Sequence, residues 1–359
     1  MKTNRFWQLV AMATVVMGLS SCGNDENVEG NNDTSSELKI VASMSPILEL
    51  NTRAAYDLQS TSIYNGDFTK VGAYIWKSGS TAASTSPAYG YQNLQMTNGT
   101  PDPTTPTYYT LTKTGTDFYF PADLANVDVY LYAPWNETAA NGTMVSPAFT
   151  VSADQSTDAN YVASDFIYGK ATASYTGTDA KTANVTMYHA LSKIILKVVP
   201  AAGVDISGLT ELKLTGVKRT TSIRMANAPS TSMTVGTNAT DHVDVASTPE
   251  GNGTDVIVTN GTNYVLADAR DYGVAAIIPP QALTDLGLSC TISGKTATKS
   301  LANLTYDVGG DDTPIGSFLP GKVYTITLNV KTGILEVQLI SIYPWESGNG
   351  VGSQLDLDF

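Results

Sequence analysis

Cys22 is the residue whose chemistry is easiest to predict from the sequence. Two serines and a leucine precede it, at the end of an apolar run that begins at Phe6 after the basic residues Lys2 and Arg5. Lipoprotein signal peptidase accepts small side chains before a cysteine whose thiol already carries a diacylglycerol. The pattern predicts a lipoprotein signal peptide over 1–21 and lipidation of Cys22, with an ordinary secretory signal as the alternative. The apolar run is shorter than the roughly 20 residues of a transmembrane helix.

Acid–base or metal chemistry would draw on the two histidines, His189 and His242. Neither has a Cys, Asp or Glu nearby at metal-ligand spacing. His189 precedes an apolar strand and is predicted to be a structural histidine, whereas His242 lies in a polar stretch. Nothing in the sequence supports a Ser-His-Asp triad, because no Gly-x-Ser-x-Gly elbow is present. We therefore expect no catalytic residue, no metal site and no cofactor, and hence no enzyme.

Two other groups of side chains could bind ligands, and each has a plainer alternative that we favour. Asp307, Asp311 and Asp312 surround two glycines and could hold calcium, but an acidic surface turn explains them better, because their spacing does not match the EF-hand. Several aromatic side chains could stack on sugars, but they could also pack across neighbouring strands. These aromatic residues are Tyr108, Tyr109, Tyr130, Tyr132 and Trp135.

Composition excludes some classes of protein. Hydrophobic residues make up 42% of the 359 residues, which is too many for a disordered chain. The net charge is −13 and no basic stripe is present to neutralise phosphates, so nucleic acid is not an expected partner. If Cys22 carries lipid, Cys290 has no partner for a disulfide within the chain. Cys290 shares a strand face with Leu288 and Ile292 and is predicted to be a buried, inert thiol.

Nearly all of the sequence from residue 38 onward favours β-strands. Apolar and polar residues alternate over 127–132, 324–330 and 335–339, and 194–199 is an apolar run interrupted only by a lysine. Glycine, proline, asparagine and aspartate separate such segments, which is typical of β-sandwiches. At most a helical turn or two is expected, over 281–286. The sequence therefore predicts an all-β fold, and a boundary between two strand-rich halves is expected near 187–194.

Several short motifs resemble those of the fimbrillin family, the type V pilins of Bacteroides-type bacteria. Together with the residues around Cys22, they cover nearly the whole chain in the order found in the family. The motifs lie at 70–74, 129–135, 165–169, 189–194, 276–281 and 321–324.

The resemblance implies two transthyretin-like β-sandwich domains in tandem, made as a lipoprotein precursor. The expected segments are the signal peptide 1–21, a lipidated tether with a removable first strand over 22–53, and domains over 54–190 and 191–359. In the family's mechanism, an arginine-specific surface protease removes the first strand, and the open groove receives a strand from the next subunit. The implied partners are that protease, the outer membrane through the lipid, and other fimbrial subunits.

Arg53 and Ala54 fit the processing site that the resemblance implies. Arg53 is the only arginine between Cys22 and Arg219, and it follows an apolar-rich stretch over 38–50 that we expect to be one strand. Protease-sensitive sites concentrate in exposed loops, although an ordinary surface arginine remains the alternative. Cleavage would remove lipid, tether and strand together and uncover a hydrophobic groove. The side chains removed with the strand, which would otherwise fill this groove, are those of Ile40, Met44, Ile47, Leu48 and Leu50.

A terminal strand is needed as the donor, and the C-terminal residues have a suitable pattern. Apolar and acidic residues alternate at the very end, and a longer apolar-rich strand over 337–345 precedes them, interrupted by a proline. Glycines between the two could act as a hinge. The alternative is a last strand folded back on its own domain. The donor residues expected from this pattern are Val337, Leu339, Leu355, Leu357 and Phe359.

The expected function is therefore that of a fimbrial subunit that polymerises by strand exchange and mediates adhesion. Its expected location is the outer membrane as a lipid-anchored precursor, and then the fimbria on the cell surface. Stalk and tip subunits are not distinguished by these motifs. The alternative is a monomeric or tip surface lipoprotein that binds glycan or host protein through its aromatic loops.

Overall fold

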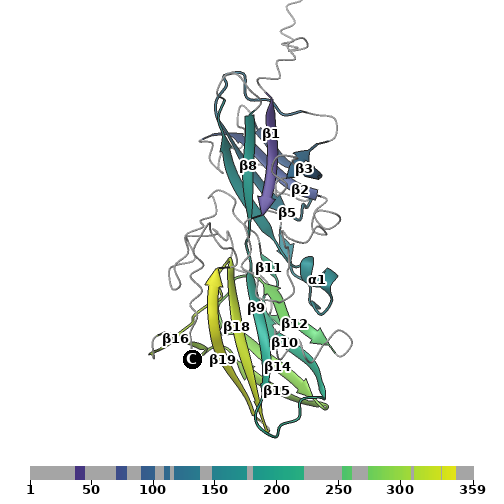
Figure 1. Ribbon diagram of the computed structural model, residues 1–359, viewed down its shortest axis with the longest axis vertical. Helices are drawn as coiled ribbons and strands as arrows, with labels where there is room; N and C mark the ends of the chain where they lie inside the picture. The colour runs from purple at the N-terminus through teal and green to yellow at the C-terminus, as the bar shows by residue number, and fades with distance from the viewer. Residues whose placement is uncertain are drawn as a thin grey trace, which may run out of the picture. The chain divides into compact units, whose positions relative to one another are not determined.

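A closed sheet of seven strands is formed by the first part of the chain in the computed structural model (Figure 1). The structure describes residues 37–44, 70–78, 90–101, 109–113, 117–137, 148–175, 181–221, 253–260, 274–308, 311–332 and 334–344. The order of the strands in this first sheet is β1-β4-β3-β2-β5-β7-β8. Their bounds are β1 Leu38–Met44, β2 Lys70–Lys77, β3 Gly90–Pro101, β4 Tyr109–Thr112, β5 Val127–Ala133, β7 Ile167–Ala173 and β8 Lys181–His189.

Two four-stranded sheets are formed by the later part of the chain. One has the order β12-β10-β14-β15 and the other the order β13-β9-β18-β19. Their bounds are β9 Ser192–Pro200, β10 Leu209–Val217, β12 Thr254–Asn260, β13 Val274–Ile278, β14 Gly287–Ile292, β15 Lys295–Ser300, β18 Lys322–Lys331 and β19 Ile334–Pro344. Two small pairs complete the described strands: β6 Phe149–Thr150 with β11 Thr220–Thr221, and β16 Thr305–Val308 with β17 Asp311–Pro314. The prediction of an all-β fold is confirmed.

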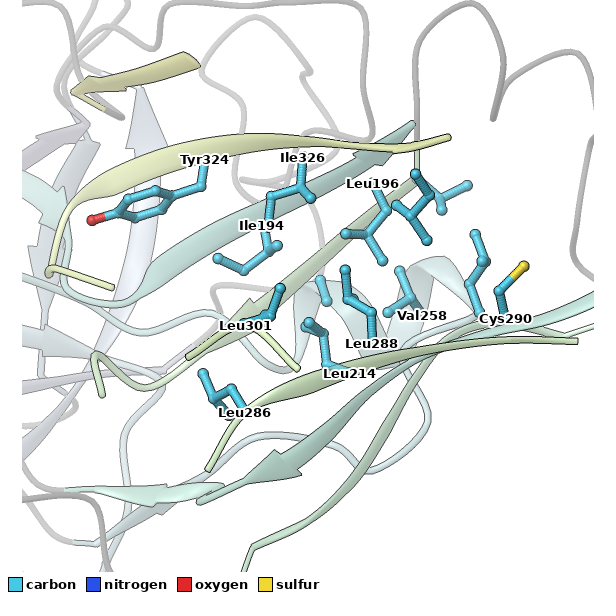
Figure 2. Close-up of a cluster of buried hydrophobic side chains, with 14 of the residues drawn as sticks. Ile194, Leu196, Leu214, Val258, Leu286, Leu288, Cys290, Leu301, Tyr324 and Ile326 are labelled. Carbon is cyan, nitrogen blue, oxygen red and sulfur yellow. The ribbon is translucent and has the colours of Figure 1, made fainter. Parts of the chain in front are cut away.

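Three hydrophobic clusters hold these sheets together. One fills the interior of the first sheet, and a second lies between the two later sheets, where Leu214 and Leu288 face Ile194 and Ile326 (Figure 2). The third cluster contains residues of both groups of sheets, among them Tyr74 of β2 and Ile195 of β9. Because this third cluster joins the two groups, the division into domains at 190/191 stays a prediction.

The strand β5 differs from the half-exposed strand that its alternating sequence predicts. Its seven residues are all buried. Val129 and Leu131 point into the first sheet, while Tyr130 and Tyr132 belong to the third cluster on the other face. A tyrosine ring buries a large apolar surface. The face of β5 that carries Tyr130 and Tyr132, which the alternating pattern predicts to be polar, is therefore buried as well.

The helix α1 (Asp158–Val162) is an element that the sequence analysis missed. Thr157 caps it, because its hydroxyl accepts a hydrogen bond from the backbone N–H of Asn160 at 3.3 Å. The predicted helical turn over 281–286 is a single turn, closed by the N–H of Leu286 on the carbonyl of Leu283 at 3.1 Å. Among the described residues, no helix is long and apolar enough to span a membrane.

Candidate functional site

The strand β1 is held by backbone pairing along both of its edges, and Figure 1 shows it beside β8. It runs parallel to β8 over seven residues, from Leu38 opposite Lys181 to Met44 opposite Met187. Its other edge is antiparallel to β4, where Ile40 lies opposite Leu111. Since β4 and β8 do not pair with each other, β1 is the strand that closes the first sheet.

The inward face of β1 is part of the hydrophobic core. Leu38 is 2% exposed and Ile40 is 1% exposed, and both pack in the cluster inside the first sheet. Ala42 packs against the same cluster and is half-buried, whereas Lys39 between them is exposed. Full burial of a large aliphatic side chain stabilises by about 1.5–3 kcal/mol, so Leu38 and Ile40 together contribute on the order of 3–6 kcal/mol.

The first residues of β1 are also fixed by neighbouring backbone groups. The N–H of Leu38 donates to the carbonyl of Phe118 at 2.7 Å, and the N–H of Lys181 donates to the carbonyl of Glu37 at 3.1 Å. We use the term β1 groove for the space that β1 fills between β4 and β8. The core residues of β4 and β8 beside it are Leu111, Ala183, Val185 and Met187.

Most of the residues predicted to take part in processing and donation lie outside the described residues. They are Cys22, Arg53, Ala54, Leu355, Leu357 and Phe359, and His242, Ile47, Leu48 and Leu50 lie outside as well. The strand predicted over 38–50 is described as far as Met44. Ile40 is buried as the groove hypothesis requires.

The strand β19 contains the two predicted donor residues that the structure describes, Val337 and Leu339. It lies at the edge of its sheet and pairs antiparallel with β18 along its whole length, with Val337 opposite Leu328 and Leu339 opposite Ile326. Val337 packs, half-buried, against the core between the two later sheets. In this structure β19 is therefore folded back on its own sheet.

His189 forms a buried pair that the sequence analysis did not anticipate. Its Nδ1 lies 2.7 Å from Oδ2 of Asp165, and both side chains are 0% exposed. Asp165 directly precedes Phe166 and β7, while His189 ends β8, so the pair joins two strand ends that are 24 positions apart in sequence. No substrate can reach side chains that are fully covered. His189 is therefore a structural histidine, as expected, and its partner is found only in the folded chain.

Two tyrosines of the suggested sugar platform are core residues, whereas the side chains of Tyr108 and Tyr109 lie outside the described part of the structure. Tyr130 and Tyr132 are buried, and the Tyr132 ring stacks on Phe166 with 5.8 Å between ring centroids. The Tyr132 hydroxyl donates to the side chain of Asn93, and the indole N–H of Trp135 donates to the Asn93 carbonyl at 3.3 Å. These rings pack across strands, which is the alternative that the sequence analysis favoured.

The remaining candidate groups lie in the later sheets. Cys290 is buried in the core between those sheets, and burial raises the pKa of its thiol to about 11. Asp307 and Asp312 lie opposite each other in the paired strands β16 and β17, and Asp311 lies opposite Val308. Within the described parts of the chain, no cluster of three or more His, Cys, Asp or Glu side chains could hold a metal ion.

Comparison with protein families decides where this chain belongs. Its sequence matches the fimbrillin-like family over residues 52–345, which is most of its length. The chain is a member of the fimbrillin-like family. In this fimbrillin-like protein, β1 lies before the matched segment and β19 forms its end. No curated protein matches the sequence.

Solved structures share the fold of this fimbrillin-like protein. A candidate cell adhesion protein from Bacteroides uniformis is 14% identical, with a TM-score of 0.56, over 86% of this chain and 97% of that one. A candidate cell adhesion protein from Bacteroides ovatus is 15% identical, with a TM-score of 0.54, over 86% and 97% of the two chains. At these identities the likeness concerns the fold alone.

A small change in β1 tests how tightly the fimbrillin-like fold holds this strand. Ile40→Val removes one methylene from a side chain that is nearly fully buried, so we expect a loss of about 1 kcal/mol in the free energy of unfolding. Lys39→Ala, at an exposed position of the same strand, is the control and should change little. Urea denaturation of the uncleaved protein measures both. An equal response of the two variants would show that the inward face of β1 is loosely packed.

Proposed function

We propose that this protein is a structural subunit of a cell-surface fimbria that mediates adhesion and polymerises by donor-strand exchange. In this proposal the chain is made as a lipoprotein precursor, anchored to the outer membrane through Cys22. An arginine-specific surface protease then cuts between Arg53 and Ala54. Membership of the fimbrillin-like family supports a pilin role, and the names of the similar solved structures agree with adhesion.

The observation that carries the proposal is the position of β1 in the first sheet. Removal of β1 would leave β4 and β8 with unpaired backbone groups on facing edges, above core residues that lose Leu38 and Ile40. Unpaired edges of this kind recruit strands from other chains. A strand that enters the groove gains main-chain hydrogen bonds along both edges, while its alternate side chains fill the pockets of Leu38 and Ile40.

The limits of the family match support the position of the cut. The shared segment begins at residue 52, next to Arg53, and leaves out β1 and everything before it. The matched segment therefore lies almost entirely within the part of the chain that would remain after cleavage, and it ends before the last fourteen residues. The donated strand comes from the C-terminal part, in which Val337, Leu339, Leu355, Leu357 and Phe359 supply the alternating apolar side chains.

Arg53→Ala tests the proposed function. The starting material is precursor without residues 1–22, treated with an arginine-specific protease and then examined by mass spectrometry and native gel electrophoresis. We expect the wild type to be cut first after Arg53 and to form oligomers that resist denaturant, and the variant to stay monomeric. Arg219→Ala is the control, because Arg219 lies in the folded part and its Nη1 donates to the carbonyl of Val151 at 2.9 Å.

Two results would reject strand exchange triggered by this cut. One is the formation of normal oligomers by Arg53→Ala. The other is clean cleavage after Arg53 that leaves only monomers, which would favour a monomeric or tip lipoprotein that binds glycan or host protein.

A further inference from the structure

Lys322 is a buried cation at the first position of β18. It is 2% exposed, and its Nζ has no hydrogen-bond partner among the residues that the structure describes. Burial lowers the pKa of this amine from 10.5 to about 8. Buried charges in proteins are normally paired or hydrogen-bonded, because an uncompensated charge is costly to remove from water. Lys322 therefore needs an explanation beyond packing.

The direction of the Lys322 side chain follows from the alternation of β18. Lys322 shares a face with Tyr324 and Ile326, which point into the core between the two later sheets (Figure 2). Val323, on the other face, belongs to the third cluster. The ammonium group thus lies at one end of an apolar core.

The end of β19 covers this part of β18. Lys322 lies directly opposite Pro344, and Tyr324 lies opposite Ile342, which packs half-buried against the core. Residues directly opposite each other in an antiparallel pair have Cβ atoms about 4.5–5.5 Å apart, so the backbone of β19 runs beside that of Lys322 at this position. If β19 left the sheet, β18 would become the edge strand and Lys322 would reach water.

The strand β19 is bound less firmly than the strand beside it. Residues 322–328 of β18 are all buried, whereas none of the four β19 side chains that the structure describes is fully buried. Ile334 is 57% exposed. The register of the two strands shifts between Thr325 and Ile326, which is a local irregularity in a ladder that otherwise runs the length of β19. At the hairpin end, Lys331 Nζ contacts Glu336 Oε1 at 2.6 Å on the surface.

We propose that Lys322 is a positioning residue for assembly and that it favours release of β19 from β18. The reason is that the unpaired ammonium group of Lys322 gains contact with water when β19 leaves the sheet. The use of the released strand as a donor rests on the proposed function, but the release itself does not. Lys322 acts at the Pro344 end, so opening begins where the chain leaves the sheet and proceeds toward the hairpin. The core keeps its fully buried residues, since Val337 and Ile342 of β19 only flank it.

The test is hydrogen–deuterium exchange of β19 in uncleaved precursor without residues 1–22, compared between wild type and Lys322→Met. Methionine has a similar volume and no charge. A pKa lowered from 10.5 to about 8 disfavours the charged form by up to about 300-fold. We therefore expect the β19 amides that donate to β18 to exchange about tenfold to hundredfold more slowly in the variant, with exchange in β1 and β8 unchanged.

Two further variants keep this test decisive. Lys331→Met makes the same change at the other end of β18 and removes only an exposed ion pair, so exchange in β19 should stay equal to the wild type or become slightly faster. Lys322→Gln replaces Lys322→Met if that variant does not fold. Unchanged or faster exchange in β19 of the Lys322 variants would overturn the proposal, as would slowing spread evenly over all strands.

Oligomer formation after cleavage at Arg53, measured beside hydrogen exchange, distinguishes failure of this inference from failure of the proposed function. Slower exchange in β19 together with slower oligomer formation by Lys322→Met would support both. Slower exchange in β19, with no oligomers from the cleaved wild type, would support the role of Lys322 in release and reject strand exchange.

Discussion

His189→Ala is expected to lower the free energy of unfolding by about 3–5 kcal/mol, because it leaves the Asp165 carboxylate buried without its partner. Nδ1 of His189 lies 2.7 Å from Oδ2 of Asp165, and neither side chain is exposed. The backbone around the pair is fixed as well, since the N–H of Ala190 donates to the carbonyl of Phe166 at 2.9 Å. Urea denaturation followed by circular dichroism measures the loss.

The double variant Asp165→Leu, His189→Leu is the matched control. Replacing a buried ion pair with apolar side chains of similar volume is often close to neutral, so the double variant should recover most of the stability lost by His189→Ala. Equal losses in the single and double variants would mean that packing volume, rather than the unpaired charge, causes the loss. A single variant within about 0.5 kcal/mol of wild type would contradict the importance of the pair.

Gly169→Ala is expected to cost about 3 kcal/mol, at the upper end of the usual effect of overpacking. A Cβ on Gly169 of β7 would lie 2.3 Å from the carbonyl oxygen of Thr186 and 2.8 Å from Cγ1 of Val185, both on β8. The first of these atoms belongs to the backbone, so β8 itself would have to move. Val185 and Thr186 are the residues that lie opposite Ala42 and Ser43 of β1.

Gly316→Ala is the control for this substitution, because no atom lies within 4 Å of the Cβ it would add. Thermal unfolding should separate the two variants clearly. Since the backbone of β8 positions β1, Gly169→Ala should also increase hydrogen exchange in β1. Equal melting temperatures for Gly169→Ala and Gly316→Ala would show that the close contact between β7 and β8 is relaxed in solution.

The strands could be predicted from the sequence because their signal is local. The run over 194–199 is apolar except for Lys197, and β9 is buried on both faces as far as Leu196, whereas Val199 is 42% exposed. In β5 the tyrosines that mark its second face pack in the third cluster. That burial depends on Ile195 and Ala275 from later strands, which no local pattern indicates. Five residues are also too few to show helical periodicity, which is why α1 was missed.

The candidate site could be predicted only in part, for a similar reason. Leu38 and Ile40 alternate with Lys39, so an inward face of β1 can be read from the sequence. Their neighbours on β8 are more than 140 positions away, and the parallel register is set by the fold. The partner of His189 was missed because metal-ligand spacing is a local criterion, whereas Asp165 meets His189 through strand pairing.

The pairing of β1 along both edges has a mechanical consequence. A strand pulled along its own axis loads all of its hydrogen bonds at once, whereas a strand peeled from one end breaks them one after another. The seven-residue parallel register with β8 and the antiparallel register with β4 place both sets of bonds across that axis. Any strand seated in the β1 groove would therefore resist tension in shear, and a filament joined in this way would hold under flow with no covalent bond between its subunits.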